Sequence, residues 1–288
     1  MPTTVPTTTV PTLDLGALPP EDLRDVARDL GAFVVTGHGI RTEVTERVAD
    51  LARLLFALPE QEKVAIASTR SEQFRGWTSF GSGFAEGWRE QFDVGAELPV
   101  VPADRRRSPA EALIGPNQWP ARLPELRDRT LWFQDRAGEV ARALLRRLAA
   151  ALLLDPDTFD RELAGDAATW TTLTRDGGEA GVSTPAATHV DPGLISLHWI
   201  GGSDRGIQIL DGRTWLEAAP TDGAFLVTIG EDLEDATDGY LRAAPHRSLP
   251  ADAERIGITF TFDAPVGVAL PHLSLPDALV VPAWADAA

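Results

Sequence analysis

The second half of the chain is a succession of short β-rich segments, and this pattern limits the fold more than any other feature. Turn-forming residues such as Asp211-Gly212 and Asp238-Gly239 separate the segments. Many short strands at this spacing are typical of an antiparallel sandwich or jelly roll. We therefore expect a mainly β protein with a jelly-roll core. The segments cover residues 169–174, 194–200, 206–210, 214–219, 224–230, 240–244 and 255–262.

The first half predicts helices that flank this core. Apolar residues fall on one helical face over residues 20–30 and again over residues 44–55. The longest helix is expected from about residue 124 to residue 154, as a brace against a sheet. Residues 31–36 indicate a buried strand, and residues 74–95 are rich in glycine and aromatic residues, which favours loops and short strands.

Three segments follow from this pattern. We expect residues 1–110 to form a helical and strand region packed on the core, and residues 111–160 to form a linker and the long brace helix. Residues 161–288 would be the jelly-roll catalytic core. We expect a single domain overall, because the first half alone has too few strands to close its own core.

The composition excludes several classes of partner. The formal net charge of −17 opposes binding to nucleic acid and to anionic membranes. The chain has no cysteine, so it forms no disulfide framework and offers no thiolate, as expected in a reducing cytoplasm. No apolar run reaches the roughly 18–20 residues that span a bilayer, and the start lacks an export signal. We therefore expect a soluble, cytoplasmic protein whose partner is a small molecule.

Three side chains have the chemistry of an iron site. Residues two apart on a strand point to the same face, so His189 and Asp191 can both reach one metal ion. Pro192-Gly193 then turns the chain, which favours a position at a strand end. His246 lies far downstream, and a jelly roll brings such distant strands together. Two imidazoles and one carboxylate can hold iron(II) on one face and leave three positions for a bidentate co-substrate and O₂.

A basic residue follows the three predicted metal ligands in the sequence. Arg255 opens the last β-rich segment, and its guanidinium can grip the carboxylate of an organic acid brought to the metal. The remaining histidines have simpler interpretations. His38 lies in a tight glycine turn and is expected to be structural, His198 is expected to be a hydrogen-bonded sheet residue or a pocket group, and His272 is expected at the surface or pocket rim.

Longer blocks of sequence resemble the isopenicillin N synthase-like group of iron(II)/2-oxoglutarate oxygenases. The resemblance runs in order along nearly the whole chain. Its blocks are GAFVVTGHGI (31–40), FALPEQEK (56–63), FRGWTSFG (74–81), WREQFDVG (88–95), GPNQWP (115–120), HVDPGLISL (189–197), GAFLVTIGEDLEDATDGYLRAAPHRS (223–248) and ERIGITFTFDAP (254–265).

The resemblance implies a double-stranded β-helix core. It implies that His189, Asp191 and His246 bind iron(II), and that Arg255 pairs with the distal carboxylate of 2-oxoglutarate. Most members of the group use O₂ to convert 2-oxoglutarate to succinate and CO₂, and oxidise a C–H bond of a bound substrate. We therefore expect a dioxygenase that hydroxylates, desaturates or cyclises a small molecule in secondary metabolism, as in natural-product biosynthesis.

The chain also departs from the family pattern. The usual Arg-x-Ser is Arg255-Ile256-Gly257 here, so the serine hydroxyl that helps to bind 2-oxoglutarate is absent, and Thr259 is the candidate to replace it. Many members carry a tyrosine on the strand before the metal pair, where Thr171 or Arg175 could substitute. An alternative is therefore an iron oxidase that does not use 2-oxoglutarate, as in isopenicillin N synthase ring closure. A third possibility is a non-catalytic metal- or ligand-binding barrel. Because Asp191 is retained, hydroxylase-type outcomes are favoured over halogenation.

Substrate contacts are predicted from the aromatic loops and the last strand. Aromatic side chains could stack an apolar or ring-bearing substrate, and an arginine could bind a carboxylate. Core packing is the alternative role for the tryptophans. The candidates are Arg75, Trp77, Phe80 and Phe262, with Trp88 and Arg89 beside them on the rim.

Overall fold

The computed structural model describes residues 9–80, 89–177, 187–201, 206–218, 221–250 and 253–279. The strands of this part of the chain are β1 (Thr12–Asp14), β2 (Ala32–Thr36), β3 (Gly76–Phe80), β4 (Arg89–Gly95), β5 (Ala168–Asp176), β6 (Ile195–Gly201), β7 (Ile207–Asp211), β8 (Thr214–Ala218), β9 (Phe225–Ile229), β10 (His246–Ser248) and β11 (Arg255–Asp263). Its α-helices are α1 (Pro20–Asp29), α2 (Thr42–Phe56), α3 (Glu60–Ala65), α4 (Pro124–Ala151), α5 (Thr158–Glu162) and α6 (Glu231–Ala236).

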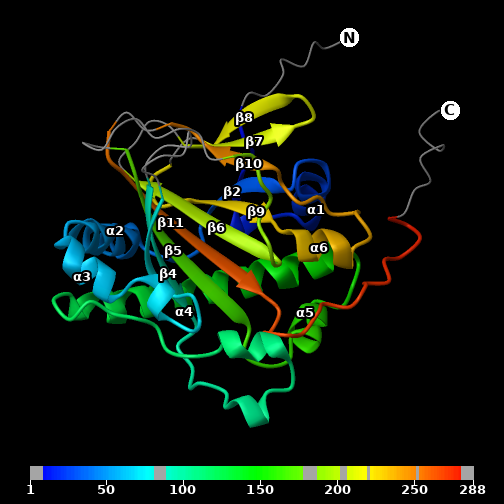
Figure 1. The fold of residues 1–288 in the computed structure, drawn as a ribbon. Helices are drawn as coiled ribbons and strands as arrows, with labels where there is room; N and C mark the ends of the chain where they lie inside the picture. The colour runs from blue at the N-terminus through cyan, green and yellow to red at the C-terminus, as the bar shows by residue number, and fades with distance from the viewer. Residues whose placement is uncertain are drawn as a thin grey trace.

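The strands form two sheets (Figure 1). Within the described residues, a large eight-stranded sheet has the order β1-β2-β9-β6-β11-β5-β4-β3, and a small three-stranded sheet has the order β10-β7-β8. All neighbouring strands are antiparallel except β1 and β2. Apolar side chains of β7 and β8, such as Ile209 and Leu216, pack with Val34 of β2 and Leu226 of β9. The predicted jelly-roll core with flanking helices is thus confirmed.

Successive side chains of β11 point alternately to the two faces of the large sheet, which we call the outer and the inner face. Ile256, Ile258, Phe260 and Phe262 are all buried in the main core. The guanidinium of Arg142 on α4 lies 5.0 Å from the centre of the Phe262 ring, so this outer face is the one that α4 covers. Because successive side chains point to opposite faces, the side chains of Arg255 and every second residue after it point to the inner face.

The inner face is polar over four neighbouring strands. Residues that lie directly opposite each other in an antiparallel pair project from the same face. Thr259 of β11 is opposite His198 of β6 and Thr172 of β5, and Thr172 is opposite Asp93 of β4. The Thr172 hydroxyl donates a hydrogen bond to Asp93 at 2.8 Å. This row of polar side chains crosses the sheet and ends at His198, beside the predicted metal ligands.

The predicted helices are confirmed in α1, α2 and α4, although α4 ends at Ala151 rather than near residue 154. The strand predicted over residues 240–244 is wrong. Its backbone N–H groups donate to separate elements instead of one ladder: Arg242 to the carbonyl of Ala27 at 3.1 Å, and Ala244 to that of Ile229 at 3.2 Å. None of the described helices contains a stretch long and apolar enough to cross a membrane.

Candidate metal centre

Backbone pairing brings the two distant histidines of the predicted iron site together. His189 and His246 form an isolated antiparallel bridge. The His246 N–H donates to the His189 carbonyl at 2.8 Å, and the His189 N–H donates to the His246 carbonyl at 3.1 Å. Their ring centres are 4.4 Å apart. The backbone pairing alone therefore places the two imidazoles next to each other.

Hydrogen bonds orient both rings in the way that metal binding requires. The Nδ1 of His189 lies 3.0 Å from the carbonyl oxygen of Ala187, and the Nδ1 of His246 lies 2.9 Å from that of Ala244. A carbonyl oxygen only accepts, so each Nδ1 carries a proton, and in the neutral imidazole Nε2 is then the nitrogen with the free lone pair. Burial lowers the pKa of His246 to about 4, so this imidazole is neutral at pH 7, as a ligand must be.

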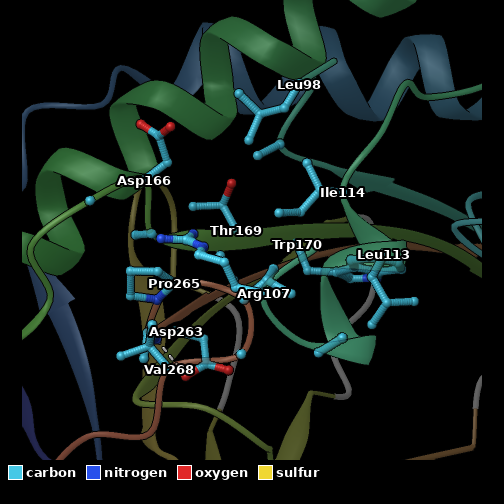
Figure 2. A pocket seen from close by; sticks show the side chains of 18 of the residues that line it. Leu98, Arg107, Leu113, Ile114, Asp166, Thr169, Trp170, Asp263, Pro265 and Val268 are labelled. Atoms are coloured by element: carbon cyan, nitrogen blue, oxygen red, sulfur yellow. Dashed lines mark hydrogen bonds between the residues drawn. The ribbon is translucent and has the colours of Figure 1, made fainter. Parts of the chain in front are cut away.

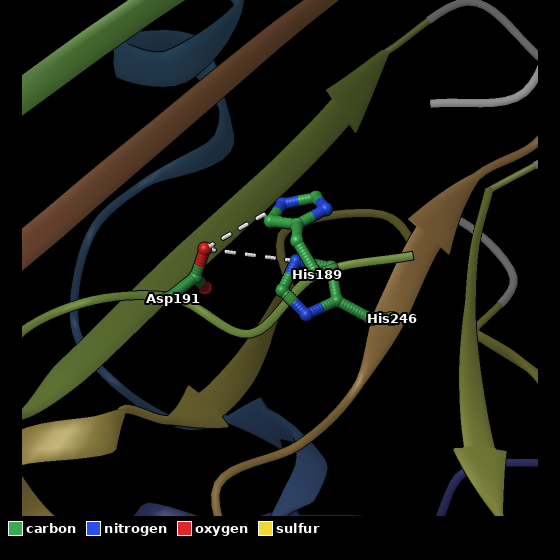
Figure 3. A group of neighbouring side chains, drawn as sticks. All are labelled: His189, Asp191 and His246. Atoms are coloured by element: carbon green, nitrogen blue, oxygen red, sulfur yellow. Dashed lines mark ion pairs between the residues drawn. The ribbon is translucent and has the colours of Figure 1, made fainter. Parts of the chain in front are cut away.

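Asp191 faces both Nε2 atoms, as Figure 3 shows. Its Oδ1 lies 3.6 Å from Nε2 of His246 and 3.9 Å from Nε2 of His189. Two ligand atoms that are each about 2.1 Å from one ion cannot be more than about 4.2 Å apart, and both distances meet that limit. One ligand atom from each of the three residues falls within 4.8 Å of the others. The residues present therefore fit a single divalent cation.

Two contacts fix the second oxygen of Asp191, Oδ2. Thr228 of β9 donates to Oδ2 at 2.7 Å, and Nε2 of His198 lies 3.1 Å from the same oxygen. Burial alone would raise the pKa of Asp191, but attraction to His198 and His246 and these hydrogen bonds outweigh it, so its pKa lies well below the usual range. The carboxylate is therefore charged and oriented with Oδ1 toward the histidines.

The turn after Asp191 is locked against the end of β9. Gly193 has a φ of +76°, and a Cβ added at Gly230 would lie 2.2 Å from the Gly193 carbonyl oxygen. The Glu231 N–H, at the start of α6, donates to the Asp191 carbonyl at 3.0 Å. Helix α6 was not predicted, although Glu231 and Asp232 are the acidic residues that favour a helix N-terminus. Helix α6 therefore fixes the backbone of Asp191.

Arg255 lies at the first position of β11 on the inner face, and it is buried. It donates a hydrogen bond to Asp176 at 3.2 Å, and Arg89 donates to the same carboxylate at 2.6 Å. These three residues are directly opposite one another on β11, β5 and β4. The two guanidinium groups carry one more unit of charge than Asp176 does. This cluster is therefore suited to an anion such as a carboxylate.

The structure places the residues proposed as substitutes for the missing family groups differently from the prediction. Thr171 is fully buried and lies opposite Phe260, so it faces the helices. Arg175 is on the same outer face, with its guanidinium 5.7 Å from the centre of the Phe56 ring of α2. Thr259 does face inward, but its hydroxyl pairs with Nδ1 of His198 at 3.2 Å.

Two predicted substrate contacts also point away from the metal side. Phe262 is an odd number of residues from Arg255 and packs beneath α4, so its assignment to the pocket is corrected. Trp77 lies opposite the buried Phe92, and its indole N–H donates to Glu90 at 2.9 Å. The assignment of Trp77 is corrected for the same reason: it belongs to the core side of the sheet.

Arg75 is buried and serves neighbouring loops. Its guanidinium donates to the carbonyl oxygens of Ala96 at 2.9 Å and Leu113 at 3.0 Å, and also to that of Gly115. Arg75 also helps to line a separate cavity of about 490 Å³. Figure 2 shows other residues of its lining, among them Leu113, Ile114 and Trp170. This cavity is next to Asp263, the last residue of β11, whereas Arg255 is the first. At about 3.3 Å per residue, the two ends are about 26 Å apart, so this cavity is not the space beside Arg255.

Replacing Arg75 with alanine is therefore expected to lower the free energy of unfolding by about 3 kcal/mol, because buried carbonyl oxygens lose their donor. Chemical denaturation followed by tryptophan fluorescence measures the change. Arg70, which is exposed, provides the control, and Arg70→Ala should stay within about 0.5 kcal/mol of the unchanged protein. Equal stability of the two variants would contradict the structural role of Arg75.

The substrate roles of Phe80 and Trp88 stay predictions, while contacts are described for His38 and His272. Phe80 lies opposite Arg89 on β3, and its side chain is exposed. Trp88 lies outside the described residues. The ring of His38 accepts from the Ile40 N–H at 3.2 Å and bonds the Gly223 carbonyl at 2.6 Å, which makes it structural. His272 forms an exposed ion pair with Asp238 at 2.9 Å.

Three further residues support the site; the sequence analysis named His198 as a sheet or pocket residue, but it did not single out Thr228 or Asp176. Thr228 and His198 hold Asp191, and Asp176 joins Arg255 to Arg89. His198 carried a signal, since it lies seven residues after Asp191 within an otherwise apolar strand. Nothing in the sequence indicated Asp176, because its role depends on the register of three strands.

Two family models match the chain. Residues 10–122 match the N-terminal region described as a non-haem dioxygenase in morphine synthesis, and residues 178–264 match the 2OG-Fe(II) oxygenase superfamily. The second match contains His189, Asp191, His246 and Arg255.

Curated proteins and solved structures are similar over most of the chain. Validamycin A dioxygenase of Streptomyces hygroscopicus subsp. limoneus is 30% identical, with 86% of this chain and 72% of that protein covered. Homoarginine-6-hydroxylase 2-ODD-C23.1 of Arabidopsis thaliana is 26% identical, with 84% and 76% covered. The fold is shared with JOX2 in complex with 2OG, Fe and JA (TM-score 0.74, 19% identity, 95% and 80% covered). It is also shared with full-length Neurospora crassa T7H in complex with alpha-KG (TM-score 0.73, 19% identity, 90% and 87% covered).

Proposed function

The chain belongs to the 2OG-Fe(II) oxygenase superfamily, and from that membership we propose that His189, Asp191 and His246 are the ligands through which it oxidises a C–H bond of a small molecule. It is an iron(II)- and 2-oxoglutarate-dependent dioxygenase. The convergence of both Nε2 atoms on Oδ1 of Asp191 carries the proposal.

Each ligand residue has a defined task in this proposal. The two histidines offer their Nε2 atoms as ligands, since their Nδ1 protons are held by backbone carbonyls. Asp191 offers one charged oxygen, while Thr228 and His198 keep the other from turning toward the metal. Iron(II) bound there would, with 2-oxoglutarate and O₂, supply the oxidant that removes hydrogen from the substrate.

Arg255 would hold the distal carboxylate of 2-oxoglutarate. Asp176 of the neighbouring strand, itself held by Arg89 of the next one, orients this guanidinium, so less side-chain entropy is lost when the anion binds. Burial of Arg255 strengthens the attraction, because little water screens it. Thr259, which was the candidate for the missing serine, instead bonds His198 and so supports Asp191.

The substrate is proposed to be a small molecule of secondary metabolism. The relatives support this class, since they include a homoarginine-6-hydroxylase and a validamycin A dioxygenase, and JOX2, which shares the fold, is solved in complex with JA. Hydroxyl groups, Asp93 and the Trp170 indole on the inner face suit a substrate with polar groups. Phe80, at the end of β3, remains our proposed apolar contact.

We also propose that the chain folds as one domain in the cytoplasm and has no nucleic-acid or membrane partner. Strands from residues 1–110 share one hydrogen-bonded sheet with strands from residues 161–288, which supports a single domain. The net charge of −17 supports the absence of anionic partners, and the absence of cysteine suits a reducing compartment.

The test is a consumption assay with iron(II), ascorbate, 2-oxoglutarate and a panel of candidate small molecules. We expect O₂ uptake and 2-oxoglutarate loss that increase with the true substrate, and one succinate per O₂. O₂ uptake without succinate would instead support the oxidase alternative that Gly257 motivates. Iron binding without O₂ uptake under any mixture would support a non-catalytic barrel and contradict the proposal.

A further inference from the structure

Gly257 lies on the inner face two residues after Arg255, and the space above it is filled from the next strand. Its cross-strand partner is Thr174 of β5. A Cβ added at Gly257 would lie 2.5 Å from Oγ1 of Thr174, closer than such atoms approach. The Thr174 hydroxyl therefore occupies the place that a side chain at position 257 would take.

The Thr174 hydroxyl also lies between the two parts of the site. On β5, Asp176 is two residues to one side and pairs with Arg255, while Thr172 is two residues to the other side and lies opposite Thr259. The Thr259 hydroxyl contacts Nδ1 of His198, and Nε2 of His198 contacts Asp191. Rows of inward side chains are about 6.8 Å apart along a strand, so Thr174 is one row from Arg255 on the side of the metal ligands.

Thr174 is distinct among the inward threonines because its hydroxyl is not engaged. Within the described residues, the other inward threonines each bond a neighbour, whereas no partner is present for Thr174. The engaged pairs include Thr78 with Ser68, Thr172 with Asp93, Thr259 with His198, Thr261 with Ser196 and Thr228 with Asp191. A partly buried hydroxyl beside a cationic cluster is available to donate to a bound carboxylate.

We propose that Thr174 replaces the missing hydroxyl at position 257 and donates a hydrogen bond to the distal carboxylate of 2-oxoglutarate held by Arg255; this inference rests on the proposed function. The hydroxyl has moved from one strand to its neighbour, and Gly257 is the small residue that makes room for it. Gly257 and Thr174 therefore form a matched pair. The absence of Arg-x-Ser is thus compatible with the use of 2-oxoglutarate.

Binding of 2-oxoglutarate to the Mn(II)-loaded protein, measured by isothermal titration calorimetry, tests the pair without turnover. Thr174→Val removes the hydroxyl at nearly constant size and is expected to raise the Kd of 2-oxoglutarate about tenfold, because a hydrogen bond to a charged group is lost. Thr174→Ser keeps the hydroxyl and should bind within about threefold of the unchanged protein. Mn(II) affinity should stay the same in all three.

The double variant Thr174→Ala/Gly257→Ser places the hydroxyl on the other strand. It should recover most of the affinity that Thr174→Ala loses, whereas Gly257→Ser alone should bind less well because the two side chains collide. Thr261→Val, whose hydroxyl bonds Ser196 at 3.1 Å, is the matched control and should bind normally. Unchanged binding in Thr174→Val would overturn this inference alone. Failure of the unchanged Mn(II)-loaded protein to bind 2-oxoglutarate would contradict the proposed function itself.

Discussion

Replacing His246 with alanine is expected to lower turnover by at least about 1000-fold and to abolish stable iron(II) binding. The remaining donors, His189 and Asp191, cannot define one face of an octahedral ion. The effect should be specific, because His246 contributes its buried Nε2 to the site while its backbone still pairs with His189. His246→Gln keeps the side-chain size and should lose iron in the same way.

Iron per chain after dialysis and succinate formation measure these losses. The control is His272→Ala, because His272 is exposed and paired only with Asp238 among the described residues. It should retain full iron content and rate. Melting temperatures establish that each variant is folded. A His246→Ala protein that binds one iron per chain and turns over at the normal rate would contradict the assigned ligand set.

Replacing Arg255 is expected to have the second largest effect, and it should act on 2-oxoglutarate rather than on iron. Arg255→Ala should raise the KM for 2-oxoglutarate about 100-fold, which corresponds to about 2.7 kcal/mol, within the range for hydrogen bonds to charged groups. Arg255→Lys should raise it about tenfold, since a point charge cannot reproduce the planar fork. Asp176 keeps its bond from Arg89 at 2.6 Å, so it is not left unpaired.

Initial rates at varied 2-oxoglutarate, with iron content measured in parallel, separate the two effects. Arg28→Lys is the control, because Arg28 is exposed on α1 and pairs with Asp25 and Asp29. It should leave the KM unchanged. An unaltered KM in both Arg255 variants would show that the guanidinium does not bind the co-substrate.

The iron ligands were predictable because their signal is local chemistry in a recognisable order. His189 and Asp191 lie two apart, and His246 precedes the last strand, so the sequence supplied the donors and the jelly-roll pattern supplied a way to bring them together. The alternation of side chains along a strand could also have predicted which face Phe262 points to. It is seven residues from Arg255 on one strand, and an odd separation puts it on the opposite face.

Other positions depend on strand register and on distant loops. Trp77 faces the helices because it lies opposite Phe92, and no local pattern in the glycine-rich segment fixes that pairing. Arg75 is buried because the loop at Leu113 and Gly115 folds over it. The hydroxyl of Thr174 fills the space above Gly257 only when β5 and β11 pair in the observed register.

Anomalous diffraction from crystals grown with Mn(II) or Fe(II) tests the central claim most directly. The expected result is one strong peak about 2.0–2.2 Å from Nε2 of His189, Nε2 of His246 and an oxygen of Asp191. It should disappear in His246→Ala crystals. A peak bound by other residues, or no peak at this position in a folded protein that consumes O₂, would contradict the account.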